Sequence, residues 1–144
     1  MRLSDYAFLH LKEYEGLRLE SYKCAGGKWT IGYGHTRGVR EGQKIDKETA
    51  NKLLQEDVEY FEKFLAKEPY AEDITQSQWD ALVSFIFNLG IGNFEGSTLR
   101  KKILRDIDDP TIPDEFRRWV YSKGKVLKGL VKRREWEAQM YEWG

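Results

Sequence analysis

The amino-acid sequence predicts an α+β fold that is mostly helical, with one small β-sheet near the N-terminus. Apolar residues recur at spacings of three and four along most of the chain, which is typical of amphipathic helices that share a core. The stretch from residue 16 to 43 departs from this pattern, because it holds seven of the 13 glycines with β-forming residues between them. The length of 144 residues is that of a single domain.

The first helix is predicted over about residues 4–14, with Ser4 or Asp5 at its cap. Gly16 is expected to end it, since glycine is the usual residue just after a helix. In the glycine-rich stretch that follows, Trp29-Thr30-Ile31 is a run of β-formers between breakers. This arrangement predicts a turn-rich antiparallel sheet.

Two long helices are predicted next. Asp46 caps the first, over about residues 47–66, which carries an apolar stripe along one face. Thr75-Gln76-Ser77-Gln78 fits a capping box at the start of the second, over about 76–89. The second helix is apolar nearly all round, so we expect it to be the buried central helix, ended by Gly90-Ile91-Gly92-Asn93.

A shorter helix is predicted after that glycine-containing segment. It starts at Gly96 or Ser97 and turns Leu104 inward together with other apolar residues. Asp109-Pro110 is expected to break it, because proline cannot continue a helix.

Two more helices complete the predicted helical body. Pro113 suits the first position of one of them, and Gly124 is expected to close it. The last helix covers about residues 128–142, with Leu127 and Val131 among the residues expected to face inward. The sequence contains no repeat, low-complexity tract or obvious linker, which favours one domain.

Charge, cysteine content and hydropathy exclude several classes of protein. The 24 basic residues balance the 24 acidic ones, so the formal net charge is zero, which disfavours a strongly basic nucleic-acid-binding protein. Cys24 is the only cysteine, so no intramolecular disulfide can form. No apolar run reaches the roughly 18 residues of a membrane span, and the N-terminal residues lack the apolar stretch of a signal peptide. We therefore expect a protein made in a reducing compartment, without signal peptide or anchor.

Metal, phosphate and thiol chemistry find little support in the sequence. The two histidines, His10 and His35, and the single cysteine offer no zinc-ligand spacing. No glycine loop ends in Gly-Lys-Ser/Thr, and Gly32-Tyr33-Gly34 is too short for a dinucleotide fingerprint. Cys24 and His35 could form a nucleophile pair, but two residues in one loop region are a weak signal. We expect no cofactor and no metal.

Glu15 is the first candidate for chemistry. It lies at the C-terminal end of the first predicted helix, next to the glycine-rich sheet. A carboxylate there faces the negative end of the helix dipole, which disfavours its ionised form. An acid held at a helix–sheet junction can serve as a general acid, although Glu15 could also be one of many solvated glutamates.

The spacing around Glu15 resembles that of the phage-type lysozymes, the endolysin family of glycoside hydrolases. In that family a Glu is followed after eight residues by an Asp or Cys and after five more by a Thr, and Glu15, Cys24 and Thr30 match both gaps. The resemblance covers about residues 5–142. It continues in three further blocks that stand in the family's order: Phe85–Gly90, Ser97–Leu99 and Gly129–Glu135.

The resemblance implies a lysozyme-like fold with two lobes in a single catalytic domain, residues 1–144. A small β-sheet lobe would cover about residues 15–46, and a linking helix about 47–66. A larger helical lobe would contain about residues 67–144 together with the N-terminal helix. The substrate cleft would lie between the two lobes and would open and close.

The resemblance also implies hydrolysis of the β-1,4 bond between N-acetylmuramic acid and N-acetylglucosamine in bacterial peptidoglycan. Glu15 would protonate the leaving oxygen, and Cys24 and Thr30 would position or activate the attacking water. Cys24 stands where many members have an aspartate, and a thiol is a poor proton acceptor unless it is ionised. Inverting and retaining stereochemistry both remain open, and Cys24 could instead be an inert loop residue.

Further site residues follow from the same resemblance. Phe87 could equally belong to the core, whereas Asn88 is a polar side chain on an apolar helix and requires a partner. The residues expected to bind substrate are Gly34, Phe87, Asn88, Ser97 and Thr98.

Three charged or titratable residues are expected to support the site. One of Arg133 and Arg134 would pair with Glu15 and set how firmly it holds its proton, and the sequence does not decide which. The alternative is that both arginines belong to a solvated basic face with neighbouring lysines, which could attract an anionic wall polymer. His35 is expected to be structural, hydrogen-bonded so that it holds its loop.

Three alternative functions remain open. A lytic transglycosylase needs one catalytic glutamate and leaves anhydro sugar ends, but the matches of Cys24 and Thr30 favour a hydrolase that uses water. A cell-wall-binding module would keep the cleft and have little activity. A nucleic-acid module on Lys123–Arg134 is disfavoured by the neutral net charge.

The expected partner is peptidoglycan, with no nucleic acid and no membrane span, and the chain is expected to be a monomer. A phage-encoded version would accumulate in the host cytoplasm before lysis and act on the cell wall. It would need a separate holin-type pore to reach that wall.

Overall fold

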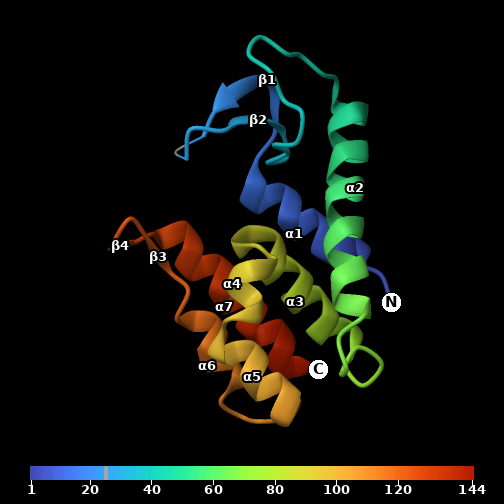
Figure 1. Cartoon of the computed structure of the whole chain (residues 1–144), viewed down its shortest axis with the longest axis vertical. Coiled ribbons are helices and arrows are strands. Elements are labelled where there is room, and N and C mark those ends of the chain that lie inside the picture. The colour runs from blue at the N-terminus through green and yellow to red at the C-terminus, as the bar shows by residue number, and fades with distance from the viewer. Residues whose placement is uncertain (25) are drawn as a thin grey trace.

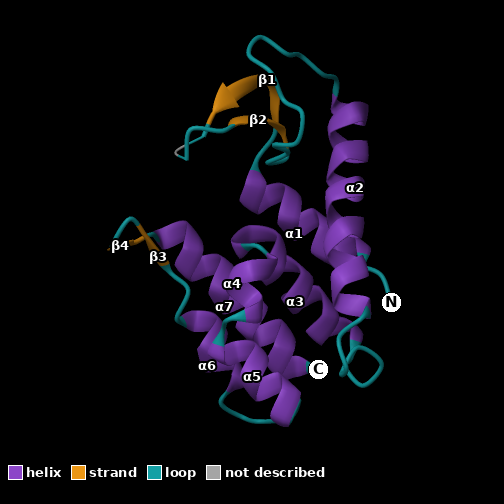
Figure 2. Ribbon diagram, viewed as in Figure 1, coloured by secondary structure: helices purple, strands orange, loops and turns teal. Residues whose placement is uncertain are grey.

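Seven helices and four short strands make up the part of the chain that the computed structural model describes, residues 1–24 and 26–144. The strands form two antiparallel pairs, β1–β2 and β3–β4, so the predicted α+β, mostly helical class is confirmed (Figure 2). The helices are α1 (Asp5–Glu15), α2 (Lys47–Ala66), α3 (Gln76–Leu89), α4 (Ile91–Glu95), α5 (Thr98–Arg105), α6 (Ile112–Arg117) and α7 (Lys128–Trp143). The strands are β1 (Arg18–Lys23), β2 (Trp29–Gly32), β3 (Tyr121–Ser122) and β4 (Lys125–Val126).

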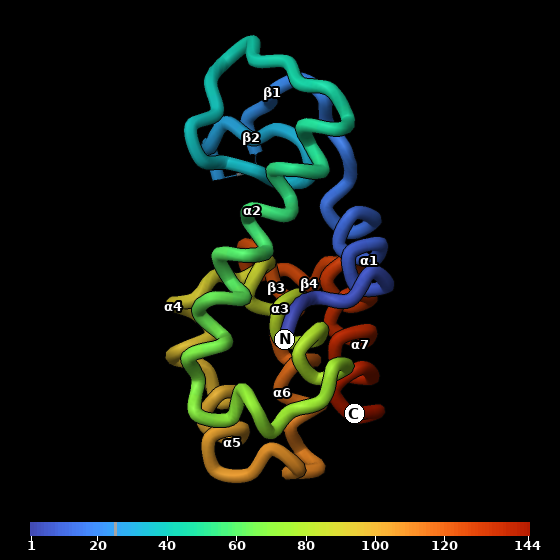
Figure 3. The backbone as a smooth tube through the Cα atoms, turned by 90° about the vertical axis from the view of Figure 1, so that its right-hand side faces the viewer, coloured from blue at the N-terminus to red at the C-terminus, as the bar shows by residue number. Residues whose placement is uncertain are grey.

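The long helix α2 joins two parts of unequal size (Figure 1). The β1–β2 sheet and the loop after it lie at one end of α2, and α3 to α7 pack around its other end (Figures 1 and 3). We call residues 16–46 the sheet region and α3 to α7 the helical region. Helix α1 lies between them and leads directly into β1, so its last residue stands where the two parts meet.

Side-chain caps begin the first three helices where the sequence predicts them. Ser4 and Asp46 each accept a hydrogen bond from the backbone N–H three residues later, at the starts of α1 and α2. Thr75 and Gln78 form the predicted reciprocal capping box at the start of α3. Each of these bonds satisfies an N–H group that the first turn of a helix leaves without a partner.

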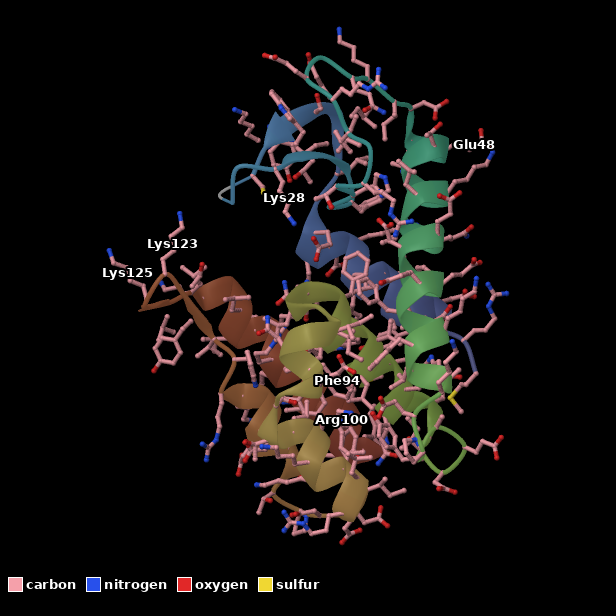
Figure 4. All side chains as sticks on the ribbon, in the orientation of Figure 1. Lys28, Glu48, Phe94, Arg100, Lys123 and Lys125 are labelled. Atoms are coloured by element: carbon pink, nitrogen blue, oxygen red, sulfur yellow. The ribbon has the colours of Figure 1, made fainter. Side chains whose placement is uncertain are left out.

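Helix α3 is the centre of the core, as predicted. Nine of its fourteen residues are buried, and it packs against α7, α2 and α1. Phe85 of α3 contacts Phe94, Phe116 and Trp119 edge-on, with ring centroids 5.4 to 6.2 Å apart. Figure 4 shows Phe94 inside this group of helices. Edge-to-face pairs of this kind add stability beyond the area they bury.

The predicted helix from Pro113 to Gly124 is wrong over its second half. Helix α6 begins one residue before Pro113 and ends at Arg117, and β3 and β4 form a short hairpin after it. Lys123 and Gly124 occupy the turn with φ of 51° and 78°, a left-handed backbone that a helix does not allow. Gly124 is therefore a hairpin residue, and Lys123 and Lys125 stand out from the hairpin (Figure 4).

Three apolar residues that were expected to face inward are exposed: Leu104, Leu127 and Val131. Leu127 and Val131 lie at the start of α7 beside the β3–β4 hairpin, at the edge of the helical region (Figure 1), where the hairpin has replaced the expected helix. Gly90 ends α3 as predicted, but α4 begins directly after it, so this segment turns one helix into the next.

None of the helices in the described part of the chain combines the length and the apolar character that crossing a membrane requires.

Candidate active site

Glu15 is the last residue of α1 and lies at the junction with the sheet region. Gly16 follows it with a φ of 69° and turns the chain toward β1. Glu15 Oε2 accepts a hydrogen bond from Nη1 of Arg133 on α7 at 2.7 Å. The Arg133 side chain is 4% exposed and that of Glu15 is 18% exposed. The sequence left two arginines as possible partners of Glu15, and the structure selects Arg133.

Gly34 provides the space for the other carboxylate oxygen of Glu15. A Cβ atom at position 34 would lie 2.5 Å from Glu15 Oε1, which is closer than real Cβ atoms approach. The φ of 77° at Gly34 also favours glycine. Any side chain here would displace the carboxylate, so the sheet region meets Glu15 at this residue.

Cys24 and Thr30 lie close together in the sheet region. Thr30 is paired with Tyr22 across the β1–β2 sheet, and Cys24 follows two residues later. The Thr30 hydroxyl donates a hydrogen bond to the Lys28 carbonyl oxygen at 3.1 Å. The backbone amides of Lys28 and Gly26, helped by the Thr30 hydroxyl, hold the pKa of the Cys24 thiol below its usual value. Among the described contacts, no hydrogen bond joins Cys24 or Thr30 to Glu15.

His35 connects the sheet region to α2. Its Nδ1 lies 2.9 Å from Oδ2 of Asp57, and its Nε2 lies 2.9 Å from the carbonyl oxygen of Arg37. Both partners are acceptors, so both hydrogen bonds form only when each ring nitrogen carries a proton. The use of both nitrogens within the protein supports a structural role, and it leaves neither of them for a nucleophile pair with Cys24.

Asp57→Asn is expected to lower the free energy of unfolding by about 1–3 kcal/mol, because it removes the charged acceptor of a mostly buried hydrogen bond. Urea unfolding followed by circular dichroism at mildly acidic pH measures the effect. Glu56→Gln is the matched control, since it is an exposed acid on the same helix. If the two variants unfold at the same urea concentration, the His35–Asp57 bond does not hold the loop.

A pocket of about 190 Å³ extends from Gly34 between the sheet region and the helices. Arg37 lies over the ring of Tyr60, 5.6 Å from its centroid, and Phe61 meets Phe87 edge-on at 5.6 Å. A few polar groups among aromatic rings are typical of ligand pockets. The residues that line the pocket are Gly34, Thr36, Arg37, Asp57, Tyr60, Phe61 and Phe87.

Sequence reasoning named two of these lining residues, Gly34 and Phe87, and missed the others. Arg37 and Tyr60 lie on different elements, and only the folded chain brings them together. The one available signal was Tyr60 itself, a large aromatic residue on the polar side of a helix, where it is half exposed.

The other three residues expected to bind substrate, Asn88, Ser97 and Thr98, lie outside the lining of this pocket. Asn88 Oδ1 accepts a hydrogen bond from Arg134 Nη2 at 2.8 Å, so it has the partner that an apolar helix requires. Ser97 is buried and its hydroxyl caps the start of α5, and Thr98 is the exposed first residue of that helix. None of the three is among the described residues that line the pocket. Their contact with substrate stays a prediction.

Arg133 and Arg134 are both buried, so neither belongs to a solvated basic face. Arg134 Nε lies 3.0 Å from Glu137 Oε1, and Arg133 Nε lies 3.4 Å from Glu137 Oε2. Burial lowers the pKa of the Arg134 guanidinium, and the nearby Glu137 carboxylate opposes that shift. Sequence reasoning missed Glu137, although its spacing of four from Arg133 is that of a helical ion pair.

Within residues 1–24 and 26–144, no group of three or more His, Cys, Asp or Glu side chains is arranged to hold a metal ion.

Comparison with known proteins assigns the whole chain to a family. The sequence model of the phage lysozyme family matches residues 12–137, which include Glu15, Cys24, Thr30 and Arg133. The chain belongs to the phage lysozyme family. The predicted assignment to the glycoside hydrolases is thereby confirmed.

Known relatives and solved structures agree with this family. The endolysin of Acyrthosiphon pisum secondary endosymbiont phage 1 is 40% identical over 99% of both chains. The endolysin of Bacillus phage B103 is 42% identical over 98% of this chain, which spans 54% of that longer protein. An endolysin from Escherichia coli O157:H7 phage FAHEc1 has a TM-score of 0.78 at 36% identity, covering 98% of this chain and 93% of that one. The muramidase domain of SpmX from Asticaccaulis excentricus has a TM-score of 0.79 at 34% identity, covering 97% of each chain. The lysozyme-like fold is therefore confirmed.

Proposed function

We propose that this chain is an endolysin-type muramidase that hydrolyses the β-1,4 bond between N-acetylmuramic acid and N-acetylglucosamine in bacterial peptidoglycan. The observation that carries the proposal is the Glu15–Arg133 pair, which stands beside a pocket lined by both the sheet region and the helices. Relatives whose names are endolysin and muramidase domain support the same substrate class.

Glu15 would act as the general acid. Arg133 holds Oε2, whereas Oε1 faces Gly34, which lines the pocket. A proton on the carboxyl group would pass to the glycosidic oxygen as the bond between that oxygen and the anomeric carbon breaks. Arg133 stays charged and cannot donate this proton, so its role would be to orient the carboxyl group.

Cys24 and Thr30 would position and activate the attacking water. The Thr30 hydroxyl would orient it, and the Cys24 thiolate would accept its proton while the water oxygen bonds to the anomeric carbon. A base that activates water in this way gives inversion at the sugar. Direct attack by the thiolate on the anomeric carbon would instead form a covalent intermediate and give retention.

Cys24 is expected to react with iodoacetamide at neutral pH faster than an ordinary thiol, because its lowered pKa increases the thiolate fraction. The rate measured against pH should rise with a midpoint below that of the same cysteine in guanidinium-unfolded protein, which is the matched control. Thr30→Val is expected to raise the midpoint, since it removes one of the donors that lower the pKa. Equal midpoints in the folded and unfolded protein would contradict the assigned environment of Cys24.

We also propose the two-lobed division for this single catalytic domain. Residues 15–46 would form the small lobe, residues 47–66 the linking helix, and residues 67–144 with α1 the helical lobe. The glycan would bind between the lobes in the pocket that both line. Distances between spin labels on the two lobes, measured with and without a peptidoglycan fragment, test whether they move; a single unchanged distance would argue against closure.

The delivery route is part of the same proposal. In an infected cell the chain would be made in the host cytoplasm, act as a monomer, and reach the wall through a separate holin-type pore. Light scattering of the purified protein tests the monomer. Expression with and without a pore-forming protein tests the route, and lysis in the absence of any pore would contradict it.

Sugar release from purified peptidoglycan tests the function itself. The wild-type protein is expected to release soluble fragments, whereas Glu15→Gln is expected to sediment with the wall and release almost none. A wild-type protein that sediments with the wall without releasing fragments would be a binding module. Release by Glu15→Gln at the wild-type rate would overturn the role of Glu15.

A further inference from the structure

Glu137 is a fully buried acidic residue that the proposed mechanism does not use. It lies on α7, one turn after Arg133, and the Ser84 hydroxyl on α3 donates a hydrogen bond to its Oε2. Arg133 Nε and Arg134 Nη2 lie 3.4 and 3.3 Å from the same oxygen. Burial raises the pKa of Glu137, while the two guanidinium groups and the Ser84 hydroxyl lower it. A buried carboxylate is costly unless it is paired, so its presence beside the candidate site requires an explanation.

Arg133, the partner of Glu15, is held from three sides. Its Nη1 donates to Glu15, and its Nη2 donates to the Ser84 carbonyl oxygen at 3.0 Å. Its Nε reaches both the Ser84 hydroxyl and the Glu137 carboxylate, at 3.3 and 3.4 Å. The guanidinium also lies over the ring of Tyr14, 5.3 Å from the centroid. Because all three guanidinium nitrogens of Arg133 have partners, the planar group is held in place and its Nη1 donates to Glu15 from one fixed direction.

The charges of this cluster balance, since two arginines face two glutamates. The uncharged neighbours on α3 are Ser84 and Asn88. Without the negative charge of Glu137, the Glu15 carboxyl would face two cations alone, which favours its ionised form and disfavours an acid that must hold a proton. The charged and titratable groups that face the cluster are Tyr14 and Glu15 from α1 and Arg133, Arg134 and Glu137 from α7.

We propose that Glu137 and Ser84 are positioning residues that fix Arg133. Through Arg133 they set the orientation of the Glu15 carboxyl group and favour its protonated form. The inference rests on the proposed function and deepens it. Glu137 supplies both a hydrogen-bond acceptor and a balancing charge, whereas Ser84 supplies hydrogen bonds alone. The two contributions are therefore separable by substitution.

Glu137→Gln tests the charge, because it keeps the size of the side chain and removes its negative charge. On a soluble peptidoglycan fragment, kcat at neutral pH is expected to fall about tenfold or more with KM nearly unchanged. The alkaline limb of the kcat profile is expected to move to lower pH by about one unit, which corresponds to that tenfold change. A loss of packing alone would not move this limb. Glu142→Gln, an exposed acid on the same helix, is the matched control and is expected to leave both quantities unchanged.

Ser84→Ala tests the positioning and keeps every charge. It is expected to lower kcat several-fold, because Arg133 loses its hydrogen bond to the Ser84 hydroxyl. KM and the alkaline limb of the kcat profile are expected to stay unchanged, because the charges still balance. This variant decides the question if Glu137→Gln does not fold. Glu137→Asp keeps the charge on a shorter side chain, so its alkaline limb is expected to coincide with that of the wild type.

A folded Glu137→Gln protein with the wild-type kcat and pH profile would overturn the proposal. Where only Ser84→Ala folds, a wild-type kcat for that variant would overturn it as well. These outcomes differ from a failure of the proposed function, in which the wild-type protein itself would release no sugar.

Discussion

Glu15→Gln is expected to lower kcat on peptidoglycan by two to four orders of magnitude, the usual contribution of a positioned general acid. Glutamine keeps an oxygen that can accept the hydrogen bond from Arg133, but it has no proton to give to the leaving oxygen. The free energy of unfolding is also expected to fall by about 1–3 kcal/mol, because Arg133 keeps an acceptor but loses the opposite charge of a mostly buried pair. The initial rate of clearing of a wall suspension, together with thermal unfolding, measures both effects.

Glu13→Gln is the control for this substitution, since it is an exposed glutamate on the same helix two residues away. It is expected to keep the wild-type rate. A Glu15→Gln protein that clears the wall as fast as Glu13→Gln would show that the acid lies elsewhere in the chain.

Arg134→Met is expected to lower the free energy of unfolding by about 3–5 kcal/mol, the largest stability effect that the structure predicts. Arg134 is fully buried, and its loss leaves Glu137 with less compensation and Asn88 without its donor. Methionine is of similar length, so the effect reports the buried charge more than a cavity. Urea unfolding of the variant against the wild type measures it.

Lys132→Met provides the comparison, because it places the same side chain at an exposed position on α7. Its unfolding free energy is expected to stay within about 0.5 kcal/mol of the wild type, as for most surface changes. An Arg134→Met protein as stable as Lys132→Met would mean that the buried ion cluster does not contribute to the fold.

The parts of this fold that the sequence predicted are those governed by local interactions. The caps at Ser4, Asp46 and Thr75 act within one turn, and the apolar pattern of α3 reports its burial directly. The β3–β4 hairpin was not predicted from the sequence, because Gly124 can end a helix as readily as it can form a turn. Choosing between the two requires knowing that the core does not extend over these residues.

In the candidate site, too, the sequence predicted what local spacing determines and missed what tertiary packing determines. The spacing of Glu15, Cys24 and Thr30 is a property of the chain, and so was visible in the sequence. Arg133 and Arg134 are neighbours that point in directions about 100° apart on a helix, so only the packing of α7 against α1 and α3 decides which one reaches Glu15. The pairing of Arg37 with Tyr60 depends on tertiary packing in the same way.

Mass spectrometry of the ends released from purified peptidoglycan tests the central claim most directly, with Glu15→Gln as the control. After borohydride reduction, a muramidase leaves fragments that end in reduced N-acetylmuramic acid, and these are expected from the wild-type protein and not from the variant. Anhydro-muramic ends would show a lytic transglycosylase, in which Cys24 and Thr30 handle no water. Fragments that end in reduced N-acetylglucosamine would contradict the proposed bond, because cleavage would then occur on the other side of each sugar.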